Sequence, residues 1–396
     1  MMLAALMSGF VLSQAYRTLA GILGLPVQAE LALSPQELGV FAAMFHLAFG
    51  ITQIGMGVAL DMHGVRRVIL AVSPFSVVGA AMSSLAQDFP WLLLGQALIG
   101  IGCAPAFLVC TLLLARAFPA ERFAALSGMV LGVGGLGLVV TGTPMAWLIE
   151  WGSWRTVFTL LAVASALSWI AMFAVVGRDA PAKGAPRESL GQALRGFGGL
   201  FLLPHTAGIM VLGSLVYAAF LTVRGLWLGP MLIEREGYTL VQSGNVALVM
   251  SLVALFSPPL FGRLDPGPLR RPRWLIAGTL ALAALFLVLG WARGAVISAV
   301  LPLVIAALSG FAVLQYADVR SAYPPSLTGR AMSVFTMAMF LGIGIMQWVT
   351  GLVAAFAQRM GWDIFATVYT FIFGCLAAGA AAYAWLPRPP AQHAPD

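Results

Sequence analysis

Long runs of apolar residues alternate with short polar stretches along the whole chain. Each run holds roughly 20 residues, the length with which an α-helix crosses the hydrocarbon core of a bilayer. Backbone groups cannot stay unbonded in hydrocarbon, so these runs are expected to be helical. The pattern predicts an all-α polytopic membrane protein with twelve transmembrane helices, at residues 2–24, 36–60, 67–88, 91–115, 123–148, 155–176, 205–229, 240–262, 274–292, 294–316, 329–355 and 364–386.

The second half of the chain repeats landmarks of the first half in the same order. The repeated pairs, at offsets of 204 to 208, are Arg17 and Arg224, Gly39 and Gly244, Asp61 and Asp265, Arg116 and Arg320, Arg122 and Arg330, and Trp154 and Trp362. A nearly constant offset favours duplication of a six-helix unit. We therefore expect two pseudo-symmetric bundles, at 1–176 and 205–387, with a polar cytoplasmic linker at 177–204 and a cytoplasmic tail at 388–396.

Composition supports the membrane interpretation and limits the chemistry. Of 396 residues, 61% are hydrophobic and 9% charged, which is too little polar surface to cover a soluble globule of this size. Cys103, Cys110 and Cys375 all fall inside predicted spans, so they are expected to pack as small apolar side chains. No zinc-type spacing occurs in the sequence, and we expect neither a metal nor a cofactor.

The net charge of +7 reflects the distribution of basic residues over short loops. With the N-terminus in the cytoplasm, fifteen Lys and Arg residues lie on the inner side and four lie outside, at Arg155, Arg235, Arg293 and Arg359. This bias predicts a multi-pass protein of the inner (plasma) membrane with both termini cytoplasmic. A nucleic-acid partner is not expected, because no soluble region concentrates the basic residues.

The connection between the second and third helices carries the most specific motif. It reads Gly57-Val-Ala-Leu-Asp61-Met-His-Gly64-Val-Arg66-Arg67, and Gly262-Arg-Leu-Asp265 echoes it in the second half. Glycines permit a tight turn there, and the arginines hold the loop at the cytoplasmic face. The motif resembles the signature loop of the major facilitator superfamily. That resemblance implies a secondary transporter whose halves are latched by this loop, with Gly57, Asp61, Gly64, Arg66, Arg67, Arg116 and Asp265 as gating residues.

Two departures from the superfamily pattern bear on function. Gln96 stands where members often carry an arginine linked to proton coupling, which puts coupling through that position in doubt. The fifth helix is glycine-rich like that of drug and proton antiporters, but Thr143 separates Gly142 from Pro144 and breaks their Gly-Pro dipeptide. These glycines favour close helix packing more than an efflux function.

Ionisable residues deep in a membrane are costly and usually functional. Here they are Arg17, Arg224 and His46, whereas all acidic residues fall in loops, at helix ends or at the terminus. Paired guanidinium N–H groups bind carboxylate or phosphate well. The two arginines resemble those on the first and seventh helices of organophosphate and phosphate antiporters, which implies a small organic anion as substrate. The alternative is that an arginine reaches toward the interface or supports a helix break.

Further substrate-binding candidates are embedded polar residues. Helical spacing puts Gln14 on the same face as Arg17, and Gln53 on the same face as His46. The other candidates are Gln96, Tyr217, Gln315 and Gln347, each of which can orient a ligand or bond across a helix interface. His46 titrates near neutral pH in water and can respond to protons, or can be a satisfied interhelical histidine.

These observations leave two functions open. One is secondary active transport of a carboxylate- or phosphate-bearing anion by alternating access, with H⁺ or a counter-transported anion as candidate coupling partner. The other is a proton-coupled drug or metabolite efflux pump. An enzyme is not expected, because the sequence has no clustered nucleophile, base or metal ligands. ATP-driven transport is not expected either, since no GxxxxGK[ST] loop is present. We expect a monomer.

Overall fold

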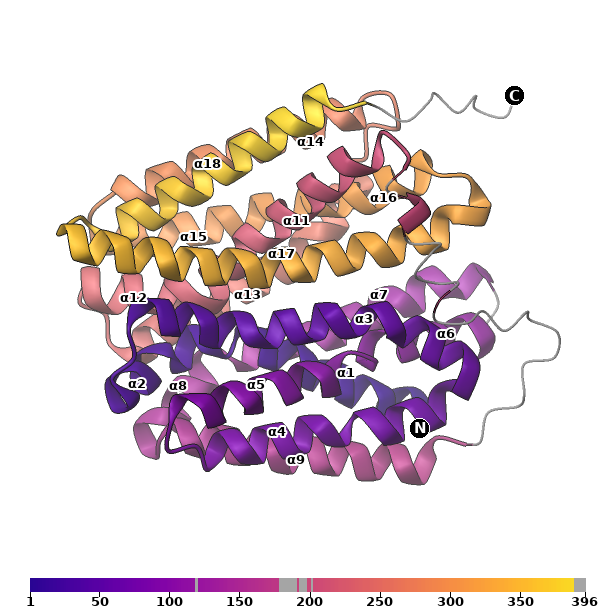
Figure 1. Ribbon diagram of the computed structural model, residues 1–396, viewed down its shortest axis with the longest axis horizontal. Coiled ribbons are helices and arrows are strands. Elements are labelled where there is room, and N and C mark those ends of the chain that lie inside the picture. Colours follow the sequence, from indigo (N-terminus) through magenta and orange to yellow (C-terminus); the bar gives the residue numbers. More distant parts are fainter. Residues whose placement is uncertain (118–119, 178–190, 192–197, 201, 388–396) are drawn as a thin grey trace.

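The computed structural model of the protein describes residues 1–117, 120–177, 191, 198–200 and 202–387, and the regular elements in this part of the chain are helices (Figure 1). The first half contains α1 (Met2–Thr18), α2 (Ala20–Leu31), α3 (Pro35–Val72), α4 (Pro74–Ser84), α5 (Phe89–Cys103), α6 (Ala106–Ala117), α7 (Ala120–Val140), α8 (Thr143–Trp151) and α9 (Trp154–Val175). Most of the expected linker 177–204 and the tail 388–396 lie outside the described residues.

The second half contains α11 (Thr206–Thr222), the π-helix η1 (Val223–Trp227), α12 (Leu228–Pro230), the π-helix η2 (Met231–Arg235), α13 (Leu240–Arg263), α14 (Arg271–Trp291), α15 (Ala295–Ser309), the 3₁₀-helix η3 (Gly310–Ala312), α16 (Val313–Ala322), α17 (Pro325–Met360) and α18 (Ile364–Trp385). Within the described residues, ten segments are long and apolar enough to cross a membrane. Together with α1–α2 and the first part of α3, they are consistent with twelve spans.

Several expected boundaries were wrong. The first span was expected to end at 24 but continues through α2 to Leu31, and the seventh was expected to end at 229 but continues through η2 to Arg235. The tenth helix was expected to end at 316, but α16 continues to Ala322, and α17 covers Pro325–Met360 rather than 329–355. Asp318 was expected near the cytoplasmic end of the tenth helix. The structure instead buries Asp318 inside the helix, where the Tyr383 hydroxyl donates a hydrogen bond of 2.7 Å to its carboxylate.

The helices of the two halves lie on opposite sides of a boundary along which α3 and α17 run side by side (Figure 1). The start of α1 and the end of α18 lie at the same end of the molecule. We call this the terminal end, and the opposite end, where α2 and α12 lie, the far end.

The second membrane span of each half, which is α3 in the first half and α13 in the second, begins at the far end with a capping box. Ser34 and Glu37 form a capping box on α3, and Thr239 and Gln242 form one on α13. Each box satisfies backbone N–H groups that a helix start leaves unbonded. The two capping boxes are 205 positions apart. The internal repeat therefore includes the hydrogen bonds that cap these two helices.

Glycines bring the two halves into backbone contact in the far-end half of the molecule. A methyl group on Gly39 of α3 would lie 2.8 Å from Cα of Gly351 on α17. The other glycine crossings join Gly21 to Gly225 and Gly229, and Gly142 to Gly244. Small residues allow helix backbones to approach this closely. Three helix pairs therefore close the boundary at the far end.

Toward the terminal end, three glycines of these helices have no described atom of the other half close to them. A methyl group on Gly57 of α3, Gly132 of α7 or Gly329 of α17 would meet no described atom within 4 Å. Among the described residues, glycine-mediated contact between the halves thus extends from the far end to the middle of α3 and α17, where a methyl group on Gly50 would lie 3.2 Å from Leu341 N, and is absent at these three glycines.

Helices are interrupted at matching positions of the halves. Breaks occur at Leu19 and at the π-helix around Gly225, and again at Ala104 and Gly310, each pair 206 positions apart. Polar side chains bond carbonyls next to the second pair of breaks: Gln53 donates to Ala104 O at 2.9 Å, and Ser257 donates to Ala307 O. Irregular backbone inside a membrane protein needs such partners.

Candidate substrate site

Arg17 lies in the last turn of α1, immediately before the break at Leu19. Its side chain is buried, and the guanidinium carbon lies 5.1 Å from the ring centroid of Phe49 on α3 and 4.6 Å from that of Phe340 on α17. The two rings themselves are 4.3 Å apart. Arg17 is therefore held by aromatic faces from both halves.

No acidic side chain of the described residues forms an ion pair with Arg17. The groups close enough to interact with its charge are the phenols of Tyr217 and Tyr316 and the thiol of Cys103. Its Nε is buried without a hydrogen-bond partner. A cation buried in this way is an uncompensated charge, which is costly unless an anion joins it.

Unpartnered polar groups surround this cation. His46 of α3 stacks on Phe340 with ring centroids 6.5 Å apart, and the amide of Gln347 lies beside it. Nε2 of His46, both amide atoms of Gln347 and Oε1 of Gln14 are buried with no hydrogen-bond partner among the described residues. Buried polar groups are normally bonded, so such a cluster marks a place that a ligand or water can complete. We call Arg17, His46, Gln347 and the rings of Phe49, Phe340, Tyr217 and Tyr316 the Arg17 site; Gln14 lies one turn before Arg17 on α1.

Arg224 has different surroundings, although it occupies the matching position in η1. Its Nε donates to Ser251 Oγ at 3.0 Å, and its Nη2 donates to Leu138 O at 3.0 Å and Thr141 Oγ1 at 3.1 Å. The carbonyl of Leu138 is available because α7 ends at Val140 and Gly142 N bonds Val139 O instead. Thr141 is also hydrogen-bonded to Thr18 at 2.7 Å. Arg224 thus supports a helix break and joins α7 of the first half to α13 of the second.

The other residues predicted to bind substrate also fall into two groups, those next to Arg17 and those bonded elsewhere in the protein. Gln53 is engaged at Ala104, as described above. Gln315 donates to Leu212 O at 3.4 Å but leaves its Oε1 unpartnered, and Nε2 of Gln96 on α5 is also unpartnered. Tyr217 lies next to Arg17. The structure therefore brings Tyr217, His46 and Gln347 to Arg17, and places Gln53 at a helix break.

The motif between the second and third helices contains the backbone turn that its glycine suggested. Gly64 has φ of 79°, a left-handed conformation that favours glycine, and it kinks α3. Arg66 donates to the carbonyl of Val176 and lies 5.4 Å from the ring centroid of Phe173, while Arg67 is exposed. The side chains of Asp61 and Arg116 lie outside the described residues.

The corresponding motif of the second half, around Asp265, lies wholly within the described residues. Asp265 accepts two hydrogen bonds from Arg271, at 2.7 and 3.0 Å, and one from Gly267 N at 3.1 Å. Arg271 also donates to Ala317 O at 3.1 Å and Ser321 Oγ at 3.0 Å on α16. The Arg271 guanidinium holds the pKa of the Asp265 carboxyl below its usual range. Asp265 thereby orients an arginine that ties the α13–α14 connection to α16.

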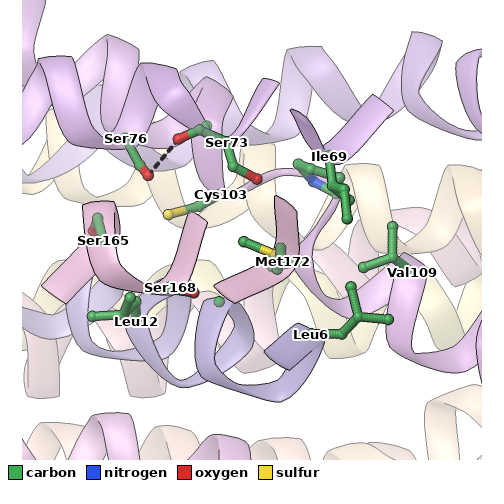
Figure 2. Close-up of a pocket in the computed structure, with 14 residues that line it drawn as sticks. Leu6, Leu12, Ile69, Ser73, Ser76, Cys103, Val109, Ser165, Ser168 and Met172 are labelled. Carbon is green, nitrogen blue, oxygen red and sulfur yellow. Dashed lines mark hydrogen bonds between the residues drawn. The ribbon is translucent and has the colours of Figure 1, made fainter. Parts of the chain in front are cut away.

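A small cavity inside the first half is distinct from the Arg17 site. It lies between α1, α4, α5 and α9 and is lined by Ser73, Ser76, Ser165 and Ser168 together with Cys103 and Met172 (Figure 2). Its volume of about 20 Å³ holds one water molecule. It is too small for an organic substrate.

The amino-acid sequence was compared with models of protein families. The model described as Major Facilitator Superfamily matches residues 5–347. The chain belongs to the Major Facilitator Superfamily. Members of this superfamily are transporters rather than enzymes, and their parallel six-helix repeats hold substrate near the bilayer midplane between the halves.

Curated superfamily relatives are similar over part of their length. The facilitated glucose transporter member 10 of solute carrier family 2 from Mus musculus is 26% identical over 192 residues, 46% of this chain and 34% of the relative. A probable L-galactonate transporter from Escherichia coli is 34% identical over 89 residues, 22% and 20% of the two chains. A probable sulfoacetate transporter from Cupriavidus necator is 24% identical over 157 residues, 40% and 36%. The chain therefore spans 20% to 36% of these relatives.

Solved superfamily structures agree over the whole chain. The nucleoside transporter NupG has a TM-score of 0.78 at 15% identity, covering 97% of this chain and 99% of that chain. A bacterial homologue of the human lysosomal transporter Spinster, in an inward-facing and unoccupied conformation, has a TM-score of 0.71 at 16% identity, covering 97% and 94%. At this identity the likeness establishes the fold alone.

Sequence reasoning missed part of the site. Phe49, Phe340 and Tyr316 contact or face Arg17, and Thr141 and Ser251 bind Arg224. Aromatic residues and hydroxyls are common in every membrane helix, so composition gave no signal for these five. Helical spacing from Arg17 and Arg224 cannot find them, because they lie on other helices.

Proposed function

We propose that this superfamily member is a secondary carrier that moves a small organic anion across the inner membrane by alternating access, with Arg17 as the residue that binds the anionic group. The observation that carries the proposal is the uncompensated charge of Arg17, buried beside the unpartnered groups of His46 and Gln347. An anion supplies the missing charge, and its polar atoms can bond those groups.

The comparisons support an anion without deciding it. The galactonate and sulfoacetate relatives are named for organic anions, whereas the glucose relative is named for a neutral sugar. The basic bias of the loops supports a cytoplasmic terminal end, so that the far-end closure described above lies on the side away from the cytoplasm. H⁺ or a counter-transported anion is the coupling partner in this proposal.

Thermal unfolding of the purified protein tests the proposal. A ligand that binds the folded state raises its apparent stability by mass action. Mono- and dicarboxylates, phosphorylated compounds, sugars and cationic drugs are compared on wild type, Arg17→Gln and the control Arg359→Gln, which removes an exposed arginine from the end of α17. We expect anions to stabilise wild type and the control but not Arg17→Gln. Stabilisation by cationic or neutral drugs that survives Arg17→Gln would refute the proposal and favour drug or metabolite efflux.

A further inference from the structure

The hydrogen bonds of Arg224 divide between the two halves of the molecule. Its Nε donates to Ser251 Oγ on α13 of its own half. Its Nη2 donates across the boundary, to Leu138 O at 3.0 Å and to Thr141 Oγ1 at 3.1 Å, both of the first half. Arg224 and Ser251 are each 1% exposed, and Thr141 is 0% exposed. A buried cation therefore joins the halves by two bonds, while its third bond stays within one half.

The two cross-boundary bonds lie among the glycine crossings of the far end. A methyl group on Gly21 of α2 would lie 2.6 Å from Arg224 O, so the backbones of the two halves touch beside the arginine. Gly142, which follows Thr141, crosses α13, where a methyl group would lie 2.8 Å from Gly244 O. A motion that separates the halves at the far end therefore also separates Arg224 from its acceptors in the first half.

Breaking the Arg224 bonds costs more than parting the glycines. Hydrogen bonds from a charged donor contribute more to stability than neutral ones, and a buried cation that loses its acceptors keeps its desolvation cost. Ser251 cannot offset this loss, because it belongs to the same half as Arg224 and its bond is present whether the far end is closed or open. The bonds to the first half therefore favour the closed far end.

We propose that Arg224 is a latch of the far end, whose bonds to Leu138 O and Thr141 hold the halves closed there and are broken and re-formed in each transport cycle. The latch gives Arg224 a role in the equilibrium between conformations, distinct from the anion binding assigned to Arg17. It rests on the alternating access of the proposed function but not on the anion, so its test needs no ligand.

Two neighbouring hydroxyls provide matched controls for the latch. Thr18 Oγ1 lies 2.7 Å from Thr141 Oγ1, and both threonines belong to the first half. Thr141→Val removes an acceptor that Arg224 uses only in the closed state. Thr18→Val makes the same chemical change but removes a bond within one half, which both states keep. Ser251→Ala likewise removes a bond that both states keep.

Alkylation of Ser243→Cys, in the full chain without native cysteines, measures opening of the far end. Ser243 is 1% exposed and precedes Gly244, which contacts α8 of the first half. We expect Thr141→Val to raise the alkylation rate about tenfold, which corresponds to ~1.4 kcal/mol. Thr18→Val and Ser251→Ala should change the rate by less than about twofold, and Thr141→Ser, which keeps the hydroxyl, should restore the slow rate.

Thermal unfolding of the same variants separates a latch from a merely structural contact. Thr141→Val, Thr18→Val and Ser251→Ala each lose a buried hydrogen bond and should all lower the unfolding temperature. Faster alkylation confined to Thr141→Val therefore cannot come from a general loss of stability. A wild-type alkylation rate in Thr141→Val, or an equal rise in all three variants, would overturn the latch. Either result would leave the anion carrier standing, because the test changes no residue of the Arg17 site.

Discussion

Arg17 and Arg224 hold matching positions in the two halves, but only Arg224 has its hydrogen bonds satisfied by the protein, and neither forms an ion pair among the described residues. Arg224 is a buried cation with three protein acceptors, whereas Arg17 has aromatic faces and no acidic partner in the described part of the chain. A charge left without compensation costs folding free energy that a ligand can recover.

Substitution of these arginines should therefore change ligand-free stability in opposite directions. Arg17→Gln should stabilise the protein by ~1–3 kcal/mol, the scale of the cost of a charge inside a bilayer. Arg224→Gln should destabilise it by about 1–3 kcal/mol, because Leu138 O and two hydroxyls lose their donor. Thermal unfolding in detergent without added anion measures both. A loss of stability in Arg17→Gln would mean that Arg17 is a structural residue.

Asp265 predicts a pH dependence with a defined sign. Arg271 lowers the pKa of Asp265 in the folded state relative to the unfolded state, so the pair stabilises the protein at pH values above the unfolded pKa of about 3.9. That stabilisation is lost as the pH falls through the lowered folded value. Wild type and Asp265→Asn should differ in unfolding temperature at pH 7 and converge at a pH below the lowered folded pKa of Asp265. An equal difference at both pH values would contradict this account.

At this scale the sequence located the charged residues but not their partners. Arg17, Arg224 and His46 stand out because ionisable residues are rare in apolar runs. What distinguishes Arg224 is the carbonyl of Leu138, which lacks a backbone donor because α7 stops at Val140 and therefore accepts from the side chains of Thr141 and Arg224. Gly142, Thr143 and Pro144 mark that stop in the sequence, but only the packing of α7 against η1 brings the carbonyl to the guanidinium.

Contacts between elements depend on glycines at the far end. A methyl group on Gly351 would lie 2.9 Å from Cα of Gly39 and 3.0 Å from Pro35 O, and backbone atoms cannot move aside. Gly351→Ala should force α17 away from α3 at a cost of about 1–3 kcal/mol and favour a state open at the far end. Alkylation of a cysteine introduced at the buried Ser243, in a variant without native cysteines, should become faster.

Gly374→Ala is the matched control for that experiment. Gly374 is also inside a helix, α18, but a methyl group there meets no described atom within 4 Å. It should leave alkylation unchanged and can stabilise α18 by up to ~1 kcal/mol through helix propensity. Equal alkylation rates in both variants would show that the α3–α17 crossing does not control far-end opening.

Hydropathy predicted the elements well but not their interruptions. Apolar runs fix where helices cross a bilayer, and the boundary errors arose where charged residues, such as Asp318, remain inside a helix. The breaks at Leu19 and Gly310 have no proline at the break itself. At the Gly310 break, Ser257 of α13 donates to Ala307 O, and the sequence of one helix alone cannot predict such a contact from another helix.

The orientation of the whole molecule in the membrane follows from its loops. The terminal end should be cytoplasmic, because most basic residues outside the spans lie in loops on that side. A fluorescent protein fused after Trp385 should fluoresce, and alkaline phosphatase fused there should be inactive. The same reporters inserted at Gly237, between η2 and α13 at the far end, should give the reverse pattern. Active phosphatase after Trp385 would invert the proposed transport geometry.

The glycine crossings also determine how the molecule responds to salt. The four ion pairs found among the described residues each join groups of one half: Glu30 with Arg155, Arg235 with Glu236, Asp265 with Arg271, and Arg293 with Asp363. Dissolved ions screen exposed charges and have little effect on close contacts between uncharged backbones. Ionic strength should therefore change the rigidity of each half and leave far-end closure nearly unchanged. A fluorophore pair across the far end would then respond to substrate in dilute buffer and in concentrated salt alike.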